Sequence, residues 1–432
     1  MTVISADWVV PVEGPPIRSG AVAIGDDGTI AAVGSIDELG EGERHRDAVI
    51  LPGFVNAHSH LEYAVYTGFG DGFPFPDWIG MHVQRKSQID LADMEAIARL
   101  GALECLRSGI TTIGDCSFSG AAATACADLG LRGTIHLEVF GESPDVLGER
   151  FEPMSERIAG ALSDHVRLGV SPHAPYTCSL ELYHACDGLG LPVATHLAES
   201  EAETEFLLTG KGAWESFADM LVRPPRTSGI RALAGAGVLG PHVLAAHCVQ
   251  ADEEEIAILA DNDVAVAHCP RSNAILGCGV APLSALRASG IRVCIATDSP
   301  ASTPSFDMFD EMRAAIIAAR ARERRPDALT AAHALELATL GGARALGQDA
   351  DLGSIAAGKK ADLTILSLAD TPFIPWEDPV TAVVLGGSPQ RVVATLVSGE
   401  TRYEKGGGTW LELIDAARSA RGRLLSHADP TS

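Results

Sequence analysis

The segment GFVNAHSH, residues 53–60, joins an apolar run to two closely spaced histidines. Its nearly unbroken apolar start predicts a strand buried on both faces, which is typical of parallel sheets. His58 and His60 are two positions apart, so on a strand both side chains point to the same face. Two imidazoles on one face are a typical pair of metal ligands. The segment therefore predicts a parallel sheet with a metal site at its end.

Seven later segments repeat this pattern of a short apolar run that leads into polar residues, and segments of helical composition separate most of them. Eight such strands in succession, alternating with helices, predict a (β/α)8 TIM barrel. The seven segments are ITTIGDCS (110–117), RGTIHLEVF (132–140), RLGVSPHAP (167–175), PVATHLAES (192–200), HVLAAHCVQ (242–250), VAVAHCPRS (264–272) and RVCIATDSP (292–300).

The two ends of the chain resemble each other and differ from the middle. Short strand patterns separated by glycine turns occupy the first 50 residues and return at 361–403. The simplest arrangement is one small β domain built from both termini, and a length of 432 residues suits a barrel plus such a domain. We therefore predict an α/β protein with a (β/α)8 TIM barrel over 53–353, a small composite β-sandwich domain from 1–52 plus 354–405, and a helical, polar tail at 406–432.

Charge and cysteine content exclude several classes of partner. The chain has 32 basic and 57 acidic residues, a net charge of −25, so its surface should repel nucleic acid and anionic membranes. The nine cysteines form no C-x-x-C pair, and most lie in apolar runs, which is typical of reduced, buried thiols. The N-terminal MTVISADWVV has no basic region or leader-like apolar stretch. We expect a cytoplasmic protein that acts on a small molecule.

Polar side chains mark the carboxyl ends of five predicted strands, which is where barrel enzymes build their active sites. His58, His60, His196 and Asp298 together offer three nitrogen ligands and one oxygen ligand. This set is typical of Zn²⁺ with a water in the open position, and Fe²⁺ would also fit. The fourth predicted strand carries no lysine that could bridge two ions. We therefore expect one divalent metal ion.

Three residues near this predicted metal are candidates for catalysis: Glu199, His247 and Asp298. A bound metal lowers the pKa of its water toward ~7, and a carboxylate at Glu199 can take a proton from that water and pass it to the substrate. The alternative is that Glu199 is a surface charge in an acidic run. His247 would orient the water. His173 would touch the substrate or brace the rim, and His268 is open between substrate contact and loop bracing.

The loop after the first barrel strand is unusually aromatic. Six of the chain's 22 aromatic residues lie between Tyr63 and Trp78, interleaved with glycines. Such a loop suits a lid over a flat, partly apolar ligand. The alternative is a hydrophobic loop packed on a helix or a partner subunit. Arg85 and Lys86 follow and could meet an anionic group of the ligand, although lysines and arginines are more often surface charges.

These residues resemble the amidohydrolase superfamily. The segments that carry the resemblance are LPGFVNAHSH (51–60), HLAES (196–200), AAHC (245–248), HCPRSN (268–273), ATDSPAS (296–302) and GSIAAGKKADLTIL (353–366). The resemblance implies one metal ion and the branch that deaminates purine or pyrimidine rings or dechlorinates triazines. It also implies the composite β-sandwich and, commonly, a homodimer.

Within that branch the chain is most similar to the aminofutalosine deaminases of the alternative menaquinone pathway. NAHSHLE (56–62), the FPDWI segment (75–79) and SPHAPYTCS (171–179) carry this likeness, together with HLAESEAETEFL (196–207) and HCPRSNAILGCG (268–279). Methylthioadenosine/S-adenosylhomocysteine deaminases share the catalytic set but usually place a ribose-binding glutamate where this chain has Ser87. We predict substrate contacts from His173, Trp78, Glu62, Arg85 and His268, with Arg85 suited to a carboxylate.

The expected reaction is hydrolytic deamination of a 6-aminopurine nucleoside, with aminofutalosine giving futalosine and ammonia. In this reading Glu199 relays a proton to ring nitrogen N1, while His247 and Asp298 hold the attacking water. The alternatives are a methylthioadenosine, S-adenosylhomocysteine or adenosine deaminase, or a hydrolase of guanine, pterin, cytosine or triazine rings. A non-catalytic scaffold is disfavoured because no member of the catalytic set is missing.

Overall fold

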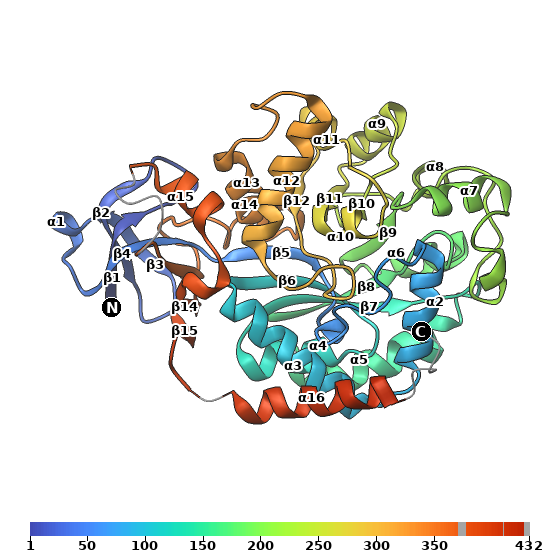
Figure 1. Ribbon diagram of the computed structural model, residues 1–432, viewed down its shortest axis with the longest axis horizontal. Helices are drawn as coiled ribbons and strands as arrows, with labels where there is room; N and C mark the ends of the chain where they lie inside the picture. The colour runs from blue at the N-terminus through green and yellow to red at the C-terminus, as the bar shows by residue number, and fades with distance from the viewer. Residues whose placement is uncertain (370–376, 409, 427–432) are drawn as a thin grey trace.

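The computed structural model describes residues 1–369, 377–408 and 410–426. Eight parallel strands form one sheet in which each strand pairs with the next in sequence, and helices surround them (Figure 1). Each strand coincides with one predicted segment, so the α/β TIM-barrel prediction is confirmed. The strands are β5 (Phe54–Ser59), β6 (Ile110–Ser117), β7 (Arg132–Val139), β8 (Val166–Pro172), β9 (Val193–Leu197), β10 (Val243–His247), β11 (Ala265–His268) and β12 (Val293–Ile295).

The barrel closes between its first and last strands through a short seam. One parallel bridge joins Ser59 to Asp298, and the Asp298 amide donates to the His58 carbonyl at 3.0 Å. The buried Asn56 side chain adds two hydrogen bonds to Thr297, one donated by its Nδ2 at 2.7 Å and one accepted by its Oδ1 at 2.9 Å. Two of the predicted metal-binding segments therefore meet at this seam.

Helices begin promptly after several barrel strands because their first residues have good N-caps. The side chains of Ser179, Ser200, Ser228 and Asp252 each accept the amide of the third helical residue. The helices of the barrel region are α2 (Phe75–Lys86), α3 (Leu91–Arg107), α4 (Ala121–Leu129), α5 (Glu152–Ile158), α6 (Leu180–Asp187), α7 (Glu201–Thr209), α8 (Gly229–Ala236), α9 (Glu253–Asp261), α10 (Pro270–Ile275), α11 (Leu283–Ala288), α12 (Met308–Glu323), α13 (Ala331–Ala338) and α14 (Leu340–Ala345).

A second sheet combines strands from both ends of the chain, as predicted. Its seven strands run in the order β15-β14-β13-β4-β1-β2-β3, and their pairing joins them into one continuous sheet. Ile4, Ile50 and Leu363 belong to a separate apolar core under this sheet. The elements are β1 (Thr2–Val9), β2 (Ile17–Ile24), β3 (Ile30–Ser35), α1 (Ile36–Leu39), β4 (Glu43–Pro52), β13 (Leu363–Ser367), α15 (Pro379–Gly386), β14 (Val392–Val397) and β15 (Glu400–Glu404).

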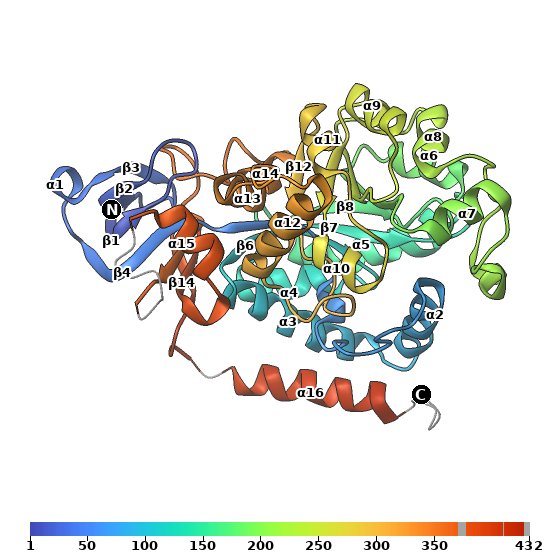
Figure 2. The same cartoon turned by 45° about the horizontal axis from the view of Figure 1, so that its top comes forward.

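The C-terminal helix α16 (Leu411–Ser426) lies along α3 at the outside of the barrel (Figures 1 and 2). Ala417, Ala420 and Leu424 on this helix are buried, and the Nε of Arg423 donates to Asp93 of α3 at 2.8 Å. The helix thus covers part of the apolar face of α3.

All nine cysteines are free and buried, in agreement with the sequence analysis. Within the described ranges, none of the helices has the length and apolarity needed to cross a bilayer.

Candidate metal centre and active site

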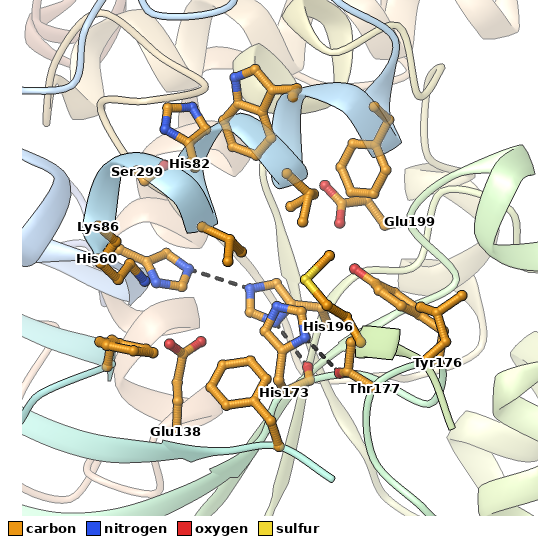
Figure 3. Close-up of a pocket in the computed structure, with 18 of the residues that line it drawn as sticks. His60, His82, Lys86, Glu138, His173, Tyr176, Thr177, His196, Glu199 and Ser299 are labelled. Carbon is orange, nitrogen blue, oxygen red and sulfur yellow. Dashed lines mark hydrogen bonds between the residues drawn. The ribbon is translucent and has the colours of Figure 1, made fainter. Parts of the chain in front are cut away.

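A cavity of about 560 Å³ lies at the carboxyl ends of the barrel strands. This volume is within the usual range for small-molecule sites. Tyr63, Phe75 and Trp78 of the aromatic segment line it, and so do Tyr176 and Trp214. The titratable residues that line it include His60, His173, His196 and Glu199, which Figure 3 labels. His247 and Asp298 line it as well.

The four predicted metal ligands converge in this cavity. His60 Nε2 lies 3.3 Å from His196 Nε2, and Asp298 Oδ1 lies 3.5 Å from His60 Nε2 and 3.7 Å from His58 Nε2. Ligand atoms arranged tetrahedrally about 2.0–2.1 Å from a zinc ion would be roughly 3.3 Å apart. The His58 Nε2 atom is buried and has no hydrogen-bond partner in the described structure. The spacing and this unpartnered nitrogen fit a bound divalent cation.

Neighbouring groups fix which nitrogen of His196 is available. Its Nδ1 lies 2.9 Å from the carbonyl oxygen of His173, which can only accept, so Nδ1 carries the proton and Nε2 presents its lone pair to the site. The backbone supports the same geometry, because the His196 amide donates to that carbonyl at 2.8 Å.

Asp298 is oriented by hydroxyl groups. Its Oδ2 accepts hydrogen bonds from Ser272 at 2.6 Å and Ser302 at 3.1 Å, which leaves Oδ1 for the cation. Burial alone would raise the pKa of Asp298, but His247, His60 and the Ser272 hydrogen bond hold it below its usual value. The carboxylate is therefore kept ionised, as a ligand must be.

Glu199 and His247 face each other beside the ligand cluster. His247 Nδ1 lies 2.9 Å from Asn273 Oδ1, so its Nε2 points toward Glu199 Oε1, 3.6 Å away. Burial, and secondarily the charge of Asp298, raises the pKa of Glu199 well above its usual value. Glu199 can thus carry a proton at neutral pH. Its burial argues against a solvated surface charge.

The turn that carries Glu199 is held by a second buried carboxylate, which the sequence analysis missed. The two oxygens of Glu203 accept the amides of Ala198 at 2.9 Å and Glu199 at 2.8 Å. Ala198 has a φ of 51°, a conformation that costs free energy for a residue with a side chain, so the turn needs such support. Burial raises the pKa of Glu203 to about 7.

Three of the predicted substrate contacts lie elsewhere. The carboxylate of Glu62 is buried and accepts hydrogen bonds from Ser117 and Ser119. Arg85 stacks on Phe69, 4.2 Å from the ring centroid, and donates to the Leu424 carbonyl of α16. His268 is buried at the end of β11 and does not line the cavity.

Local packing explains these placements. Glu62 is in the short 3₁₀ turn Leu61–Tyr63, which directs its carboxylate toward the end of β6. Arg85 is drawn to the aromatic surface beneath α16. Trp78 and His173, the other two predicted substrate contacts, line the cavity.

Two further charged residues line the cavity. Lys86 on α2 was considered above as a partner for an anionic group of the ligand, whereas Glu138 at the end of β7 was missed. The sequence carried a signal for Glu138, because it ends a barrel strand as the predicted ligands do. His82 also lines the cavity, and both of its ring nitrogens are buried without a partner in the described structure.

A (β/α)8 barrel whose strand ends present three histidines, an aspartate and a buried glutamate defines a metal-dependent hydrolase. Comparison with known proteins gives the family. The model of the amidohydrolase family matches residues 49–402, so the chain belongs to this family. It is accordingly a hydrolase that acts on C–N bonds.

Individual relatives are similar over nearly the whole chain. A 5-methylthioadenosine/S-adenosylhomocysteine deaminase from Moorella thermoacetica is 34% identical, covering 92% of this chain and 93% of that protein. A 5′-deoxyadenosine deaminase from Methanothermobacter thermautotrophicus is also 34% identical, covering 90% of each. The crystal structure of an adenosine deaminase from Xanthomonas campestris with bound zinc has a TM-score of 0.87 at 27% identity, covering 98% of each chain.

Proposed function

We propose that this enzyme hydrolytically deaminates an adenosine-type nucleoside with the help of one divalent metal ion, most simply zinc. The observation that carries the proposal is the convergence of His58, His60, His196 and Asp298 beside Glu199 in one cavity. The names of the relatives support the reaction class, and the zinc in the Xanthomonas structure supports the metal.

The proposed roles follow from protonation and placement. A bound ion would supply Lewis acidity and lower the pKa of water at the site. Glu199 would give its proton to N1 of the ring and take one from the attacking water. The Nε2 of His247, with its proton on Nδ1, would accept a hydrogen bond from that water and orient it. Asp298 would act as a ligand and would accept the second proton of that water. This proton would pass to the amino group, so that the C6–N bond breaks, ammonia leaves and a 6-oxo product remains.

The cavity also suits a flat base. Tyr63, Phe75 and Trp78 line it, and Phe75 and Trp78 stack with ring centroids 6.3 Å apart. Aromatic walls bury the faces of a purine at little conformational cost. His173 is proposed as a substrate contact, because it lines the cavity beside the metal ligands.

The 5′ substituent is the finer part of the proposal. The motifs shared with aminofutalosine deaminases make aminofutalosine our candidate, while the relatives' names point to methylthioadenosine, S-adenosylhomocysteine and 5′-deoxyadenosine. Arg85, which we expected to meet the carboxylate of aminofutalosine, instead stacks on Phe69 and donates a hydrogen bond to a carbonyl of α16. The homodimer and the cytoplasmic location stay predictions of the sequence.

The test is ammonia release by zinc-loaded protein from these four nucleosides, adenosine and guanine. A kcat/KM for aminofutalosine at least tenfold above the others would support the finer proposal. A preference for another nucleoside would refute it and leave the reaction class intact. Turnover of guanine alone, or of no purine, would refute deamination of adenosine-type nucleosides.

A further inference from the structure

Lys86 presents an unusually placed ammonium group to the cavity. Its Nζ lies 4.0 Å from the centroid of the Phe118 ring and 4.4 Å from that of Tyr63. In the described part of the chain the ammonium forms no hydrogen bond or ion pair within 4.0 Å. The two rings stabilise the cation through their faces. Its three N–H donors therefore remain available to a ligand.

Glu138 presents a carboxylate to the same cavity. It is buried, and its carboxylate accepts no hydrogen bond from the residues that the structure describes. One of its oxygens lies within 4.8 Å of ring nitrogens of both His173 and His196. Figure 3 shows this carboxylate directed into the cavity between His60 and His173. A buried carboxylate without a partner is costly, which indicates that a ligand supplies one.

The charges around these two groups are already balanced. Lys86 and Glu138 interact electrostatically with each other, and Glu62 and Arg150 add one further charge of each sign. Burial lowers the pKa of Lys86, and the two carboxylates oppose that shift. An additional anion would lie near Glu138 and be repelled. The site therefore favours a neutral ligand group that both donates and accepts hydrogen bonds.

We propose that Lys86 and Glu138 bind the vicinal hydroxyl groups of the substrate's ribose. A vicinal diol donates to a carboxylate and accepts from an ammonium, which matches this pair. Because Glu138 is close to a nitrogen of His196, the sugar next to the base is the part of the nucleoside within reach, rather than the far end of a 5′ substituent. This inference rests on the proposed function and adds the two residues that recognise the ribose.

The experiment compares adenosine with 2′-deoxyadenosine, 3′-deoxyadenosine and 2′,3′-dideoxyadenosine as substrates of the zinc-loaded enzyme. The unmodified enzyme should lose about 10–100-fold in kcat/KM for each missing hydroxyl that is bound, because each loss leaves a charged group unpaired. In the Glu138→Gln and Lys86→Met variants, the loss of kcat/KM caused by a missing hydroxyl should shrink to about threefold or less. The reason is that the charged partner of that hydroxyl has already been removed, so the same interaction cannot be lost twice. Calorimetric binding of inosine and 2′,3′-dideoxyinosine gives a second readout without turnover.

Gln84→Met is the matched control, because Gln84 is exposed on the same helix as Lys86. It should keep the discrimination of the unmodified enzyme, and melting temperatures should show that all variants are folded. Equal turnover of adenosine and its dideoxy analogue by the unmodified enzyme would overturn the inference while leaving deamination intact. So would variants that slow all substrates alike, or a Lys86→Met effect confined to carboxylate-bearing nucleosides. Failure to deaminate any nucleoside would refute the proposed function, and the inference with it.

Discussion

Replacing Glu203 by glutamine tests whether the turn that carries Glu199 is part of the catalytic machinery. The glutamine oxygen can accept one of the two amides, but its NH₂ group faces the other donor. One buried backbone N–H therefore loses its partner, which costs about 1–3 kcal/mol. If that free energy is expressed in the position of Glu199, kcat falls about 5- to 150-fold. KM should change little, because Glu203 does not line the cavity.

The difference in stability between the unmodified enzyme and this variant should also depend on pH, in a defined direction. In the unfolded chain Glu203 titrates near 4.5, whereas burial raises its folded pKa to about 7. The folded state therefore holds the proton more tightly, so the carboxyl group stabilises the fold at low pH and this contribution is lost as pH rises through 7. Relative to that of Glu203→Gln, the free energy of unfolding of the unmodified enzyme should fall by about 2 kcal/mol between about pH 5.5 and pH 8.

The assays are steady-state ammonia release and urea unfolding over this pH range. Glu201→Gln is the control, since Glu201 is exposed at the start of the same helix. A variant with unchanged kcat and reduced stability would show that Glu203 supports the fold and not the position of Glu199. A stability difference that grows with pH would contradict the assignment of its pKa.

Three further changes have separate readouts. Glu199→Gln should lower kcat by ~10²–10⁴-fold with unchanged zinc content by atomic absorption, and near-full activity would exclude Glu199 as the proton carrier. Removing the metal with a chelator should abolish activity and lower the free energy of unfolding by about 2.7 kcal/mol relative to protein in zinc at 100 times its Kd, whereas equal stability would argue against the His–Asp cluster as its site. Leu424→Ala should destabilise the fold by about 2–5 kcal/mol and leave kcat unchanged, because this side chain of α16 is buried and does not line the cavity. An undiminished denaturation midpoint would show that Leu424 does not anchor α16.

The barrel and the cluster of predicted metal ligands could be foreseen because both depend on short-range patterns. A strand buried on two faces is largely apolar, and polar residues mark its end, so the convergence of His58, His60, His196 and Asp298 could be predicted from the sequence. The parallel arrangement then brings those ends to one rim. The composite sheet was predictable for the same reason, since both termini carry strand patterns.

Substrate contacts were less predictable because they depend on side-chain direction. Arg85 and Lys86 are neighbours on one helix, and about 100° of rotation separates them. That rotation places Lys86 in the cavity and Arg85 against α16, and the sequence alone does not set the phase of the helix. The role of Glu203 was missed, because a helix-start glutamate looks the same in sequence whether it caps its own helix or bonds the preceding turn.

The position of the predicted metal ligands across the barrel seam matters for biosynthesis. Of the predicted ligands, His58 lies on the first barrel strand and His60 directly follows it, whereas Asp298 follows the last strand. The side-chain hydrogen bonds beside them join residues 241 positions apart. A ribosome must therefore complete almost the whole barrel before the ligand set exists. Metal binding by the complete set is therefore possible only late in the synthesis of each chain. An ion held by all four residues would indicate that the first and last barrel strands have come together.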